Sequence, residues 1–237
     1  MRNMLKAEKF KFFHSCVLWV IIGVLFAFCC ISIMTGVYNS AESALLNISK
    51  DIVVPLLGCS VYGAIILLDD FSNGLLQHYI AGGYKRTSII CAKFIHYMLG
   101  CSMLLLVYPF LCIGFTAIVR GIETSFALVI WKYIFIYLKS LPLYWGIVGL
   151  FFFISILLQN AAVAIGVSVA TTIFLGVFTN RLYTGNGNIL KYSTVIQLNG
   201  VAVNPVSGEY FIAVAISFFV LGSCLCGSII KFRRTQY

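Results

Sequence analysis

Charged side chains are scarce in this sequence of 237 residues. Asp, Glu, Lys and Arg together make up 10% of it, and its mean hydropathy is +1.02. A soluble domain carries about 25% charged residues. Because the chain has too few charges to cover a surface that faces water, we exclude a soluble protein and predict an integral membrane protein. Its length fits one transmembrane domain over residues 1–237, without a separate soluble domain.

Sequence motifs of catalysis and of metal binding are also missing. His14, His78 and His96 are far apart in the sequence, and neither H-E-x-x-H nor G-x-S-x-G occurs. The stretch "GGYKRTS" at 82–88 lacks the G-x4-G-K-[ST] spacing that wraps backbone amides around a phosphate. We therefore expect no enzyme activity, no metal and no cofactor in this chain. A membrane-embedded enzyme is the alternative that the sequence favours least.

Disulfide-rich and barrel architectures are excluded by two further absences. Nearly all of the nine Cys lie inside apolar runs, where Cys behaves as a small hydrophobic residue, and no long outer loop contains one. Segments of about ten residues with alternating hydrophobicity, which form membrane barrels, do not occur. Because lipid-exposed backbone must satisfy its own hydrogen bonds, the apolar runs are expected to be helices.

Apolar stretches of about 20 residues predict an all-α membrane protein with six transmembrane helices. The predicted spans cover residues 15–37, 52–69, 88–118, 140–158, 161–179 and 210–230. The first run, Cys16 to Thr35, is too long for the apolar region of a signal peptide, which has about 7–15 residues. We therefore interpret this run as a retained span.

The uneven distribution of basic residues predicts the orientation of the chain. Segments 1–14, 70–93, 159–160 and 231–237 hold ten of the sixteen Lys and Arg, and segments 38–51, 119–139 and 180–209 hold six in a longer stretch of sequence. The positive-inside rule then places both termini in the cytoplasm. This distribution accounts for the net charge of +9 without nucleic acid, which we exclude as a partner. The basic and aromatic start, "MRNMLKAEKFKFFH", predicts an N-terminal interfacial helix on the headgroups of membrane lipids.

Two outer segments leave alternatives open. Residues 125–139, "SFALVIWKYIFIYLK", are apolar but too short to cross alone, so they form either an interfacial helix or the outer end of the fourth span. Residues 180–209 are long and begin with Gly and Asn, and they contain either a short helix or a re-entrant segment.

Charges in the middle of the spans are nearly absent, and Lys93 and His96 near the inner end of the third span are the exceptions. Proton- or ion-coupled transporters usually carry charged groups inside their spans. We expect Lys93 to reach the inner headgroups with its long side chain, and we favour a packing role for His96 over a proton relay. The spans therefore show no energy source for transport.

Residues 69–93 form a much longer interruption than a membrane hairpin needs. Asp69 and Asp70 follow the second span, and a carboxylate at this place can cap a new helix. Residues at four-residue spacing then form one apolar face: Phe71, Leu75 and Tyr79. This pattern predicts a short amphipathic helix at the cytoplasmic surface.

The end of this helix is marked by Gly82 and Gly83, because glycine commonly ends a helix in a left-handed conformation. Lys85 and Arg86 follow, at the level of the headgroups, before the third span begins. Three interpretations remain open. The helix rests on the membrane, is the helical end of the second span, or contacts a cytoplasmic partner that supplies energy.

At these residues the chain resembles the type-2 ABC exporter permeases, in particular the small six-span permeases of bacitracin and lantibiotic self-immunity exporters. The basic start "LKAEKFKFFHS" is similar to theirs, as is the six-span plan with both ends inside. The first cytoplasmic loop supplies the remaining similarity, through Asp70, Gly74, Gly82-Gly83, Lys85-Arg86 and Lys93. The outer loops are too short to hold the large extracellular domain of the bacitracin-sensing permeases.

The resemblance implies an exporter of amphipathic peptides or other hydrophobic compounds, including antimicrobial peptides, in a bacterial plasma membrane. Two cytoplasmic ATP-binding subunits would hold ATP and Mg²⁺, and a second permease chain, identical or homologous, would complete the transporter. Residues 70–84 would be the coupling helix in a cleft of the ATPase. The docking residues implied are Asp70, Phe71, Gly74, Leu75, Leu76, Tyr79, Gly82, Gly83, Lys85 and Arg86. The alternative function is a secondary transporter or channel without an ATPase.

Small residues recur in the fifth predicted span at four-residue spacing, at Ala162, Gly166 and Ala170. Such spacing lets two membrane helices approach closely. The stripe therefore serves either the contact between two permease chains or packing within one chain.

Overall fold

The computed structural model describes residues 15–38, 40–48, 53–72, 79–121, 125–183, 194, 197–198 and 208–234. Within these ranges all regular structure is helical, which confirms the predicted all-α class for this part of the chain. The helices are α2 (Cys16–Met34), α3 (Ala41–Ile48), α4 (Val53–Ser72), α6 (Arg86–Arg120), α7 (Phe126–Leu158), α8 (Ala161–Tyr183) and α10 (Gly208–Arg234). The predicted N-terminal interfacial helix and most of residues 180–209 lie outside the described residues.

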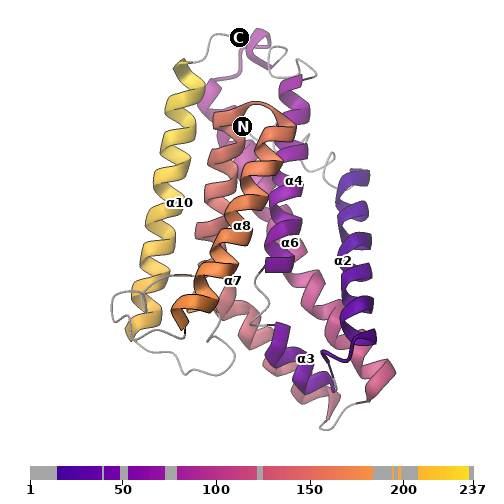
Figure 1. Ribbon diagram of the computed structural model, residues 1–237. Coiled ribbons are helices and arrows are strands. Elements are labelled where there is room, and N and C mark those ends of the chain that lie inside the picture. The colour runs from indigo at the N-terminus through magenta and orange to yellow at the C-terminus, as the bar shows by residue number, and fades with distance from the viewer. Residues whose placement is uncertain are drawn as a thin grey trace.

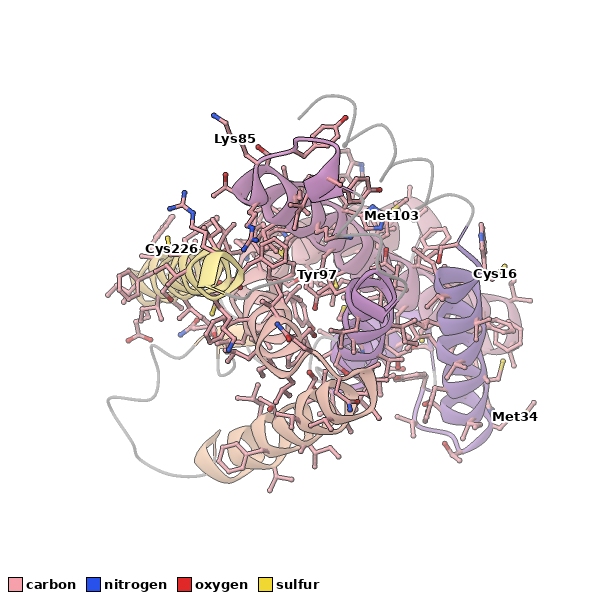
Figure 2. All side chains as sticks on the ribbon, turned by 90° about the horizontal axis from the view of Figure 1, so that it is seen from above. Cys16, Met34, Lys85, Tyr97, Met103 and Cys226 are labelled. Atoms are coloured by element: carbon pink, nitrogen blue, oxygen red, sulfur yellow. The ribbon has the colours of Figure 1, made fainter. Side chains whose placement is uncertain are left out.

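Successive long helices run in alternating directions through one bundle (Figure 1). Seen from above, α2 and α10 lie at opposite edges of it (Figure 2). We call the end that holds the start of α2, the turn before α6 and the end of α10 the proximal end. The opposite end, which holds α3, is the distal end (Figure 1).

In the part of the chain that the structure describes, four helical segments are long and apolar enough to cross a membrane. They are Cys16–Met34, Arg86–Arg120, Ala127–Leu158 and Gly208–Arg233. Two further apolar segments, Val53–Leu68 in α4 and Ala161–Val177 in α8, are shorter. Four long apolar helices make the chain a multi-pass membrane protein.

Helices α6 and α7 extend beyond the predicted third and fourth spans. They have 35 and 33 residues, or about 50 Å each at 1.5 Å per residue, and the hydrocarbon core of a bilayer is about 30 Å thick. Because α7 is continuous from Phe126, residues 125–139 and the predicted fourth span belong to one helix, which favours the second of the two alternatives given for this segment. No helix-breaking residue precedes Pro142 in this apolar stretch, and the helix accommodates that proline. At the distal end α3 packs against both long helices (Figure 1).

The centre of the bundle is a close contact between α4 and α6. The ring of Tyr62 lies over Gly100 of α6, and the ring of Tyr97 lies over Gly63 of α4. The two rings are stacked with their centroids 6.4 Å apart, and Phe152 of α7 packs against Tyr97. Two glycines therefore provide the space in which two buried tyrosines pack.

A serine of α10 enters the hydrogen-bond ladder of α7. The N–H of Gly146 donates to Ser217 Oγ at 2.9 Å, and Ser217 Oγ donates to the carbonyl of Pro142 at 2.6 Å. In a regular helix Gly146 would donate directly to Pro142, four residues earlier. Insertion of a side chain into this ladder is a known cause of helix bending. Ser217 therefore joins α7 to α10 at the place where α7 contains a proline.

Candidate functional site: the proximal turn and a lateral groove

A helical turn ends at the proximal end just before α6. Gly83 has a φ of +79°, its N–H donates to the carbonyl of Ile80 at 3.0 Å, and the N–H of Tyr84 donates to the carbonyl of Tyr79 at 3.2 Å. These two bonds are the Schellman motif, in which a left-handed residue closes a helix. The prediction that Gly82 and Gly83 end a helix is confirmed.

The side chains of this proximal turn, residues 79–86, face in two directions. Tyr79 is half-buried, makes an edge-to-face contact with Tyr84 at 6.3 Å, and packs against the core of the bundle. Lys85 is exposed, as are both glycines of the turn. Arg86 donates to the carbonyl of Arg233 at 3.2 Å, at the end of α10, where a cation is favourable. The turn is therefore anchored to the bundle by Tyr79 and Arg86 and presents Lys85 outward.

The two aspartates before this turn do not cap a new helix. Helix α4 continues to Ser72, so Asp69 and Asp70 have helical backbone, whereas a capping residue has non-helical backbone. The predicted capping role was wrong, because the helix of the second span does not stop at the first charged residue. Of the other predicted docking residues, Phe71 has described backbone only, and Gly74, Leu75 and Leu76 lie outside the described residues.

Two ionisable side chains lie inside the bundle on α6. Lys93 is 2% exposed and His96 is 5% exposed, and both interact with other groups of the chain. The expectation that Lys93 extends to the headgroups was wrong, because the side chain is enclosed by protein. The packing role favoured for His96 stays a prediction.

The small-residue stripe of α8 faces outward. Ala162, Gly166 and Ala170 are all exposed, and a Cβ added at Gly166 would meet no atom within 4 Å. The opposite face of α8 packs on α4 through Ala164, which contacts Ala64. Among the described residues, packing within the chain therefore does not use the stripe, and its role between two permease chains stays a prediction.

An apolar groove lies between α2 and α4, and we call it the lateral groove. It has a volume of about 530 Å³ and is lined by twelve residues, from Cys16 to Phe28 on α2 and from Val54 to Ile65 on α4. At its floor Leu25 of α2 approaches Gly58 of α4. Sequence reasoning missed this groove, because its residues look like those of any lipid-facing helix. The space between two helices depends on how they pack, which no local pattern signals.

The comparisons with known proteins assign no family to the chain. No protein-family model matches it, and no curated protein matches it. In the part of the chain that the structure describes, no three His, Cys, Asp or Glu side chains lie together as a metal site. The features that bear on function are therefore the proximal turn, the buried Lys93 and His96, the exposed stripe of α8 and the lateral groove.

Proposed function

We propose that the chain is the permease subunit of an ATP-binding cassette exporter in a bacterial plasma membrane. It moves an amphipathic peptide or another hydrophobic compound, and immunity to an antimicrobial peptide is the physiological role that fits this cargo. The chain itself is not an enzyme. ATP and Mg²⁺ are bound by two cytoplasmic ATP-binding subunits, and a second permease chain, identical or homologous, completes the path.

The observation that carries the proposal is the proximal turn. A capped helix end leads directly into α6, is fixed to the end of α10 by Arg86, and exposes Gly82, Gly83 and Lys85. A force applied at such a turn acts on a transmembrane helix without an intervening flexible link. This is the mechanical connection that a chain without its own energy source needs to a cytoplasmic ATPase.

In the proposed topology six helices cross the membrane, namely α2, α4, α6, α7, α8 and α10. Two of them, α4 and α8, have apolar stretches shorter than about 20 residues and cross with the help of their flanking turns. An even number of crossings puts both termini on one side. The proximal end carries Lys85, Arg86, Lys231 and Arg233, so the positive-inside rule supports a cytoplasmic location for it.

The pairing of two permease chains is proposed for the exposed face of α8. Small side chains at Ala162, Gly166 and Ala170 allow another helix to approach closely. Since membrane helices associate mainly by van der Waals packing, a row of small residues open to the surroundings suits such a contact.

Two pairs of matched substitutions test the docking of the ATPase. Leu75→Asp and Lys85→Glu change the proposed docking segment, and Leu128→Asp and Lys132→Glu make the same changes at exposed positions of α7 toward the distal end. Loss of an interface anchor costs about 2 kcal/mol or more, which is roughly a thirtyfold loss of affinity. We therefore expect the tagged chain, purified from host membranes, to lose its co-purifying ATPase when it carries Leu75→Asp or Lys85→Glu. It should keep the ATPase when it carries Leu128→Asp or Lys132→Glu.

Retention of an ATPase at wild-type stoichiometry by both Leu75→Asp and Lys85→Glu would contradict the docking role of this turn. Release of the ATPase by the two distal variants as well would show that the effect is a general loss of folding. Tyr79 is less suitable for this test than Leu75, because its contact with Tyr84 makes it part of the bundle.

A secondary transporter is the second candidate, and the burial of Lys93 and His96 in α6 is the observation that favours it. Ionisable groups enclosed in a membrane protein commonly mark ion or proton paths. Transport that persists without any ATPase and is abolished by His96→Ala would support this candidate. Transport that needs the ATPase and survives His96→Ala supports the exporter.

A further inference from the structure

We infer that a small pocket between α6 and α7 binds a primary ammonium group at the end of an alkyl chain, which is the chemistry of a lysine side chain. Its lining comes from Leu45 of α3, Pro55 of α4, residues between 105 and 113 of α6, residues between 133 and 144 of α7, and Leu198. We call it the distal pocket, because α3 lies at the distal end of the bundle (Figure 1). The inference does not depend on the proposed transport function.

The distal pocket is small and lies partly at the surface of the bundle. Its volume is about 40 Å³, which is room for about three water-sized groups at about 10–15 Å³ each. Leu45 and Leu198 in the lining are 7% and 1% exposed, whereas Pro109, Tyr137 and Ser140 are only half-buried. An ammonium nitrogen with two methylene carbons therefore fits, and the half-buried side gives it a way in.

Three hydroxyl groups of the lining residues have already donated their protons. Tyr133 donates to the carbonyl of Leu106 at 2.6 Å, and Tyr137 donates to the carbonyl of Ser102 at 2.8 Å. Ser140 donates to the carbonyl of Tyr137 at 3.0 Å. Because a carbonyl only accepts and a hydroxyl has a single proton, each of these three oxygens has only lone pairs left for a ligand.

A fourth acceptor comes from a proline in α6. Pro109 has no N–H, so it cannot donate to the carbonyl of Leu105, four residues earlier, as a regular helix requires. Both residues line the pocket. Among the described lining residues there is no Lys, Arg, His, Trp, Asn or Gln, so no side-chain N–H group is present to donate. The lining therefore favours a ligand that donates several hydrogen bonds.

An alkylammonium group matches this lining better than other cations do. An ammonium has three N–H donors and no acceptor, and tyrosine rings attract cations. Seven of the eleven lining residues have apolar side chains, which suit an alkyl chain. An alkali-metal ion is bound by a ring of oxygen atoms instead. A guanidinium has five donors in a rigid planar fork and more atoms than three water-sized groups.

Two natural sources carry a primary ammonium on a short alkyl chain, a lysine side chain and an ethanolamine headgroup. In the headgroup a phosphate follows the ammonium after two carbons. Phosphate oxygens are further acceptors, and they would meet a lining that already consists of acceptors and apolar groups. The chemistry of the pocket therefore selects the lysine type.

Binding to the purified full-length chain, measured by ligand-observed NMR, tests the inference. The probes are ethylammonium, ethanol and ethyltrimethylammonium, which share the ethyl group. We expect ethylammonium to bind at least tenfold more tightly than the others, because ethanol has no charge and ethyltrimethylammonium has no N–H. No binding of ethylammonium, equal binding of the three probes, or displacement of ethylammonium by an equal concentration of Na⁺ or K⁺ would overturn the inference.

Two competitors distinguish the sources. We expect Nα-acetyllysine amide to displace ethylammonium, and O-phosphoethanolamine to be at least tenfold less effective because of its phosphate. Displacement by O-phosphoethanolamine at the same or a lower concentration would refute the lysine type.

Matched tyrosine variants locate the bound ammonium. Tyr133→Phe combined with Tyr137→Phe removes two acceptor oxygens and keeps both rings. Tyr210→Phe is the control, because its hydroxyl donates to the carbonyl of Lys139 at 2.9 Å and Tyr210 does not line the pocket. We expect the double variant to lose ethylammonium binding at least tenfold and the control to stay within twofold of the wild type. Unchanged binding by the double variant would contradict the assigned site.

A proline variant serves if the double tyrosine variant does not accumulate. Pro109→Ala restores the N–H that satisfies the carbonyl of Leu105, and alanine favours a helix. Pro142→Ala is the control, because it restores an N–H to the carbonyl of Leu138, and neither residue lines the pocket. We expect at least threefold weaker binding of ethylammonium by Pro109→Ala only. Equal affinities in the two proline variants would count against the pocket as the binding site.

Discussion

Two tyrosine side chains in the centre of this bundle are held in place because the facing helix has a glycine, without a Cβ, at each contact. Tyr62 and Tyr97 are fully buried, and each occupies the space that a Cβ would take on a glycine of the facing helix. Around this contact the thiols of Cys59 and Cys101 lie near the backbone carbonyls of each other's helix, at 3.8 and 3.9 Å. Because other side chains fill the surrounding core, neither ring can move to another position.

Gly63→Ala is therefore expected to destabilise the chain. The new Cβ would lie 2.5 Å from the ring of Tyr97, and adding volume to a packed core typically costs about 1–3 kcal/mol. Thermal unfolding of the detergent-purified chain, followed by a thiol-reactive dye that reports exposure of Cys59 and Cys101, measures the loss. Gly166→Ala is the control, because nothing lies within 4 Å of that position and alanine favours a helix by up to about 1 kcal/mol. A midpoint for Gly63→Ala at or above that of the control would refute this account.

Single residues also show what sequence alone can predict. The helix end at Gly83 was predictable, because only a glycine adopts a φ of +79° without strain. The burial of Lys93 was not, because a lysine near the end of a span has the same sequence context whether it faces headgroups or protein. Which neighbours enclose a residue is decided by helix packing.

Helices α6 and α7 are joined near the middle of α6 by three side-chain hydrogen bonds. The hydroxyls of Tyr133 and Tyr137 donate to the carbonyls of Leu106 and Ser102 at 2.6 and 2.8 Å. Trp145 Nε1 donates to Ser102 Oγ at 3.1 Å. These bonds join Tyr133, Tyr137 and Trp145 of α7 to the middle of α6.

Ser217→Ala tests the insertion of α10 into the ladder of α7. Removal of the hydroxyl leaves the N–H of Gly146 without its present acceptor, and a buried unsatisfied group costs about 1–3 kcal/mol. The thermal midpoint should fall, and hydrogen exchange at residues 143–147 should accelerate relative to the rest of α7. Ser223→Ala, at an exposed position of α10, should leave both the thermal midpoint and the exchange rates unchanged. Equal exchange rates in Ser217→Ala and the wild type would show that α7 completes its own backbone hydrogen bonds at residues 143–147 without Ser217.

The helices were predictable as elements, but their ends and the spaces between them were not. Long apolar stretches identify helices such as α2 and α10 directly. The sequence left residues 125–139 open between an interfacial helix and the outer end of the fourth span, because they are too short to cross alone, and the structure shows that they are continuous with the next apolar stretch. The lateral groove depends on the angle between α2 and α4, and neither helix encodes that angle by itself.

The whole chain places the ends of its described helices on two opposite sides. The start of α2, the proximal turn and the end of α10 share one end of the bundle, and the end of α6 and the start of α7 lie at the other (Figure 1). This arrangement puts Lys85, Arg86, Lys231 and Arg233 on a common side. It therefore makes the orientation testable with two positions.

Lys85 and Ser125 are exposed residues, one at each end of the bundle, and each is replaced by Cys in a separate variant. With an impermeant maleimide on intact cells, followed by peptide mapping, we expect labelling at residue 125 and none at residue 85. After permeabilisation both positions should react, because both side chains are accessible in the folded chain. Labelling at residue 85 in intact cells would reverse the orientation and remove the proximal turn from the cytoplasm.

The length of α6 gives it the properties of a lever. It begins directly after the proximal turn and continues without interruption to Arg120 at the distal end, where it contacts α3. In a rod of about 52 Å, a tilt of 10° about the midpoint displaces each end by about 4–5 Å. In the proposed exporter, a push at the proximal turn would therefore move the distal end of α6 in the opposite direction, less any bending at Pro109.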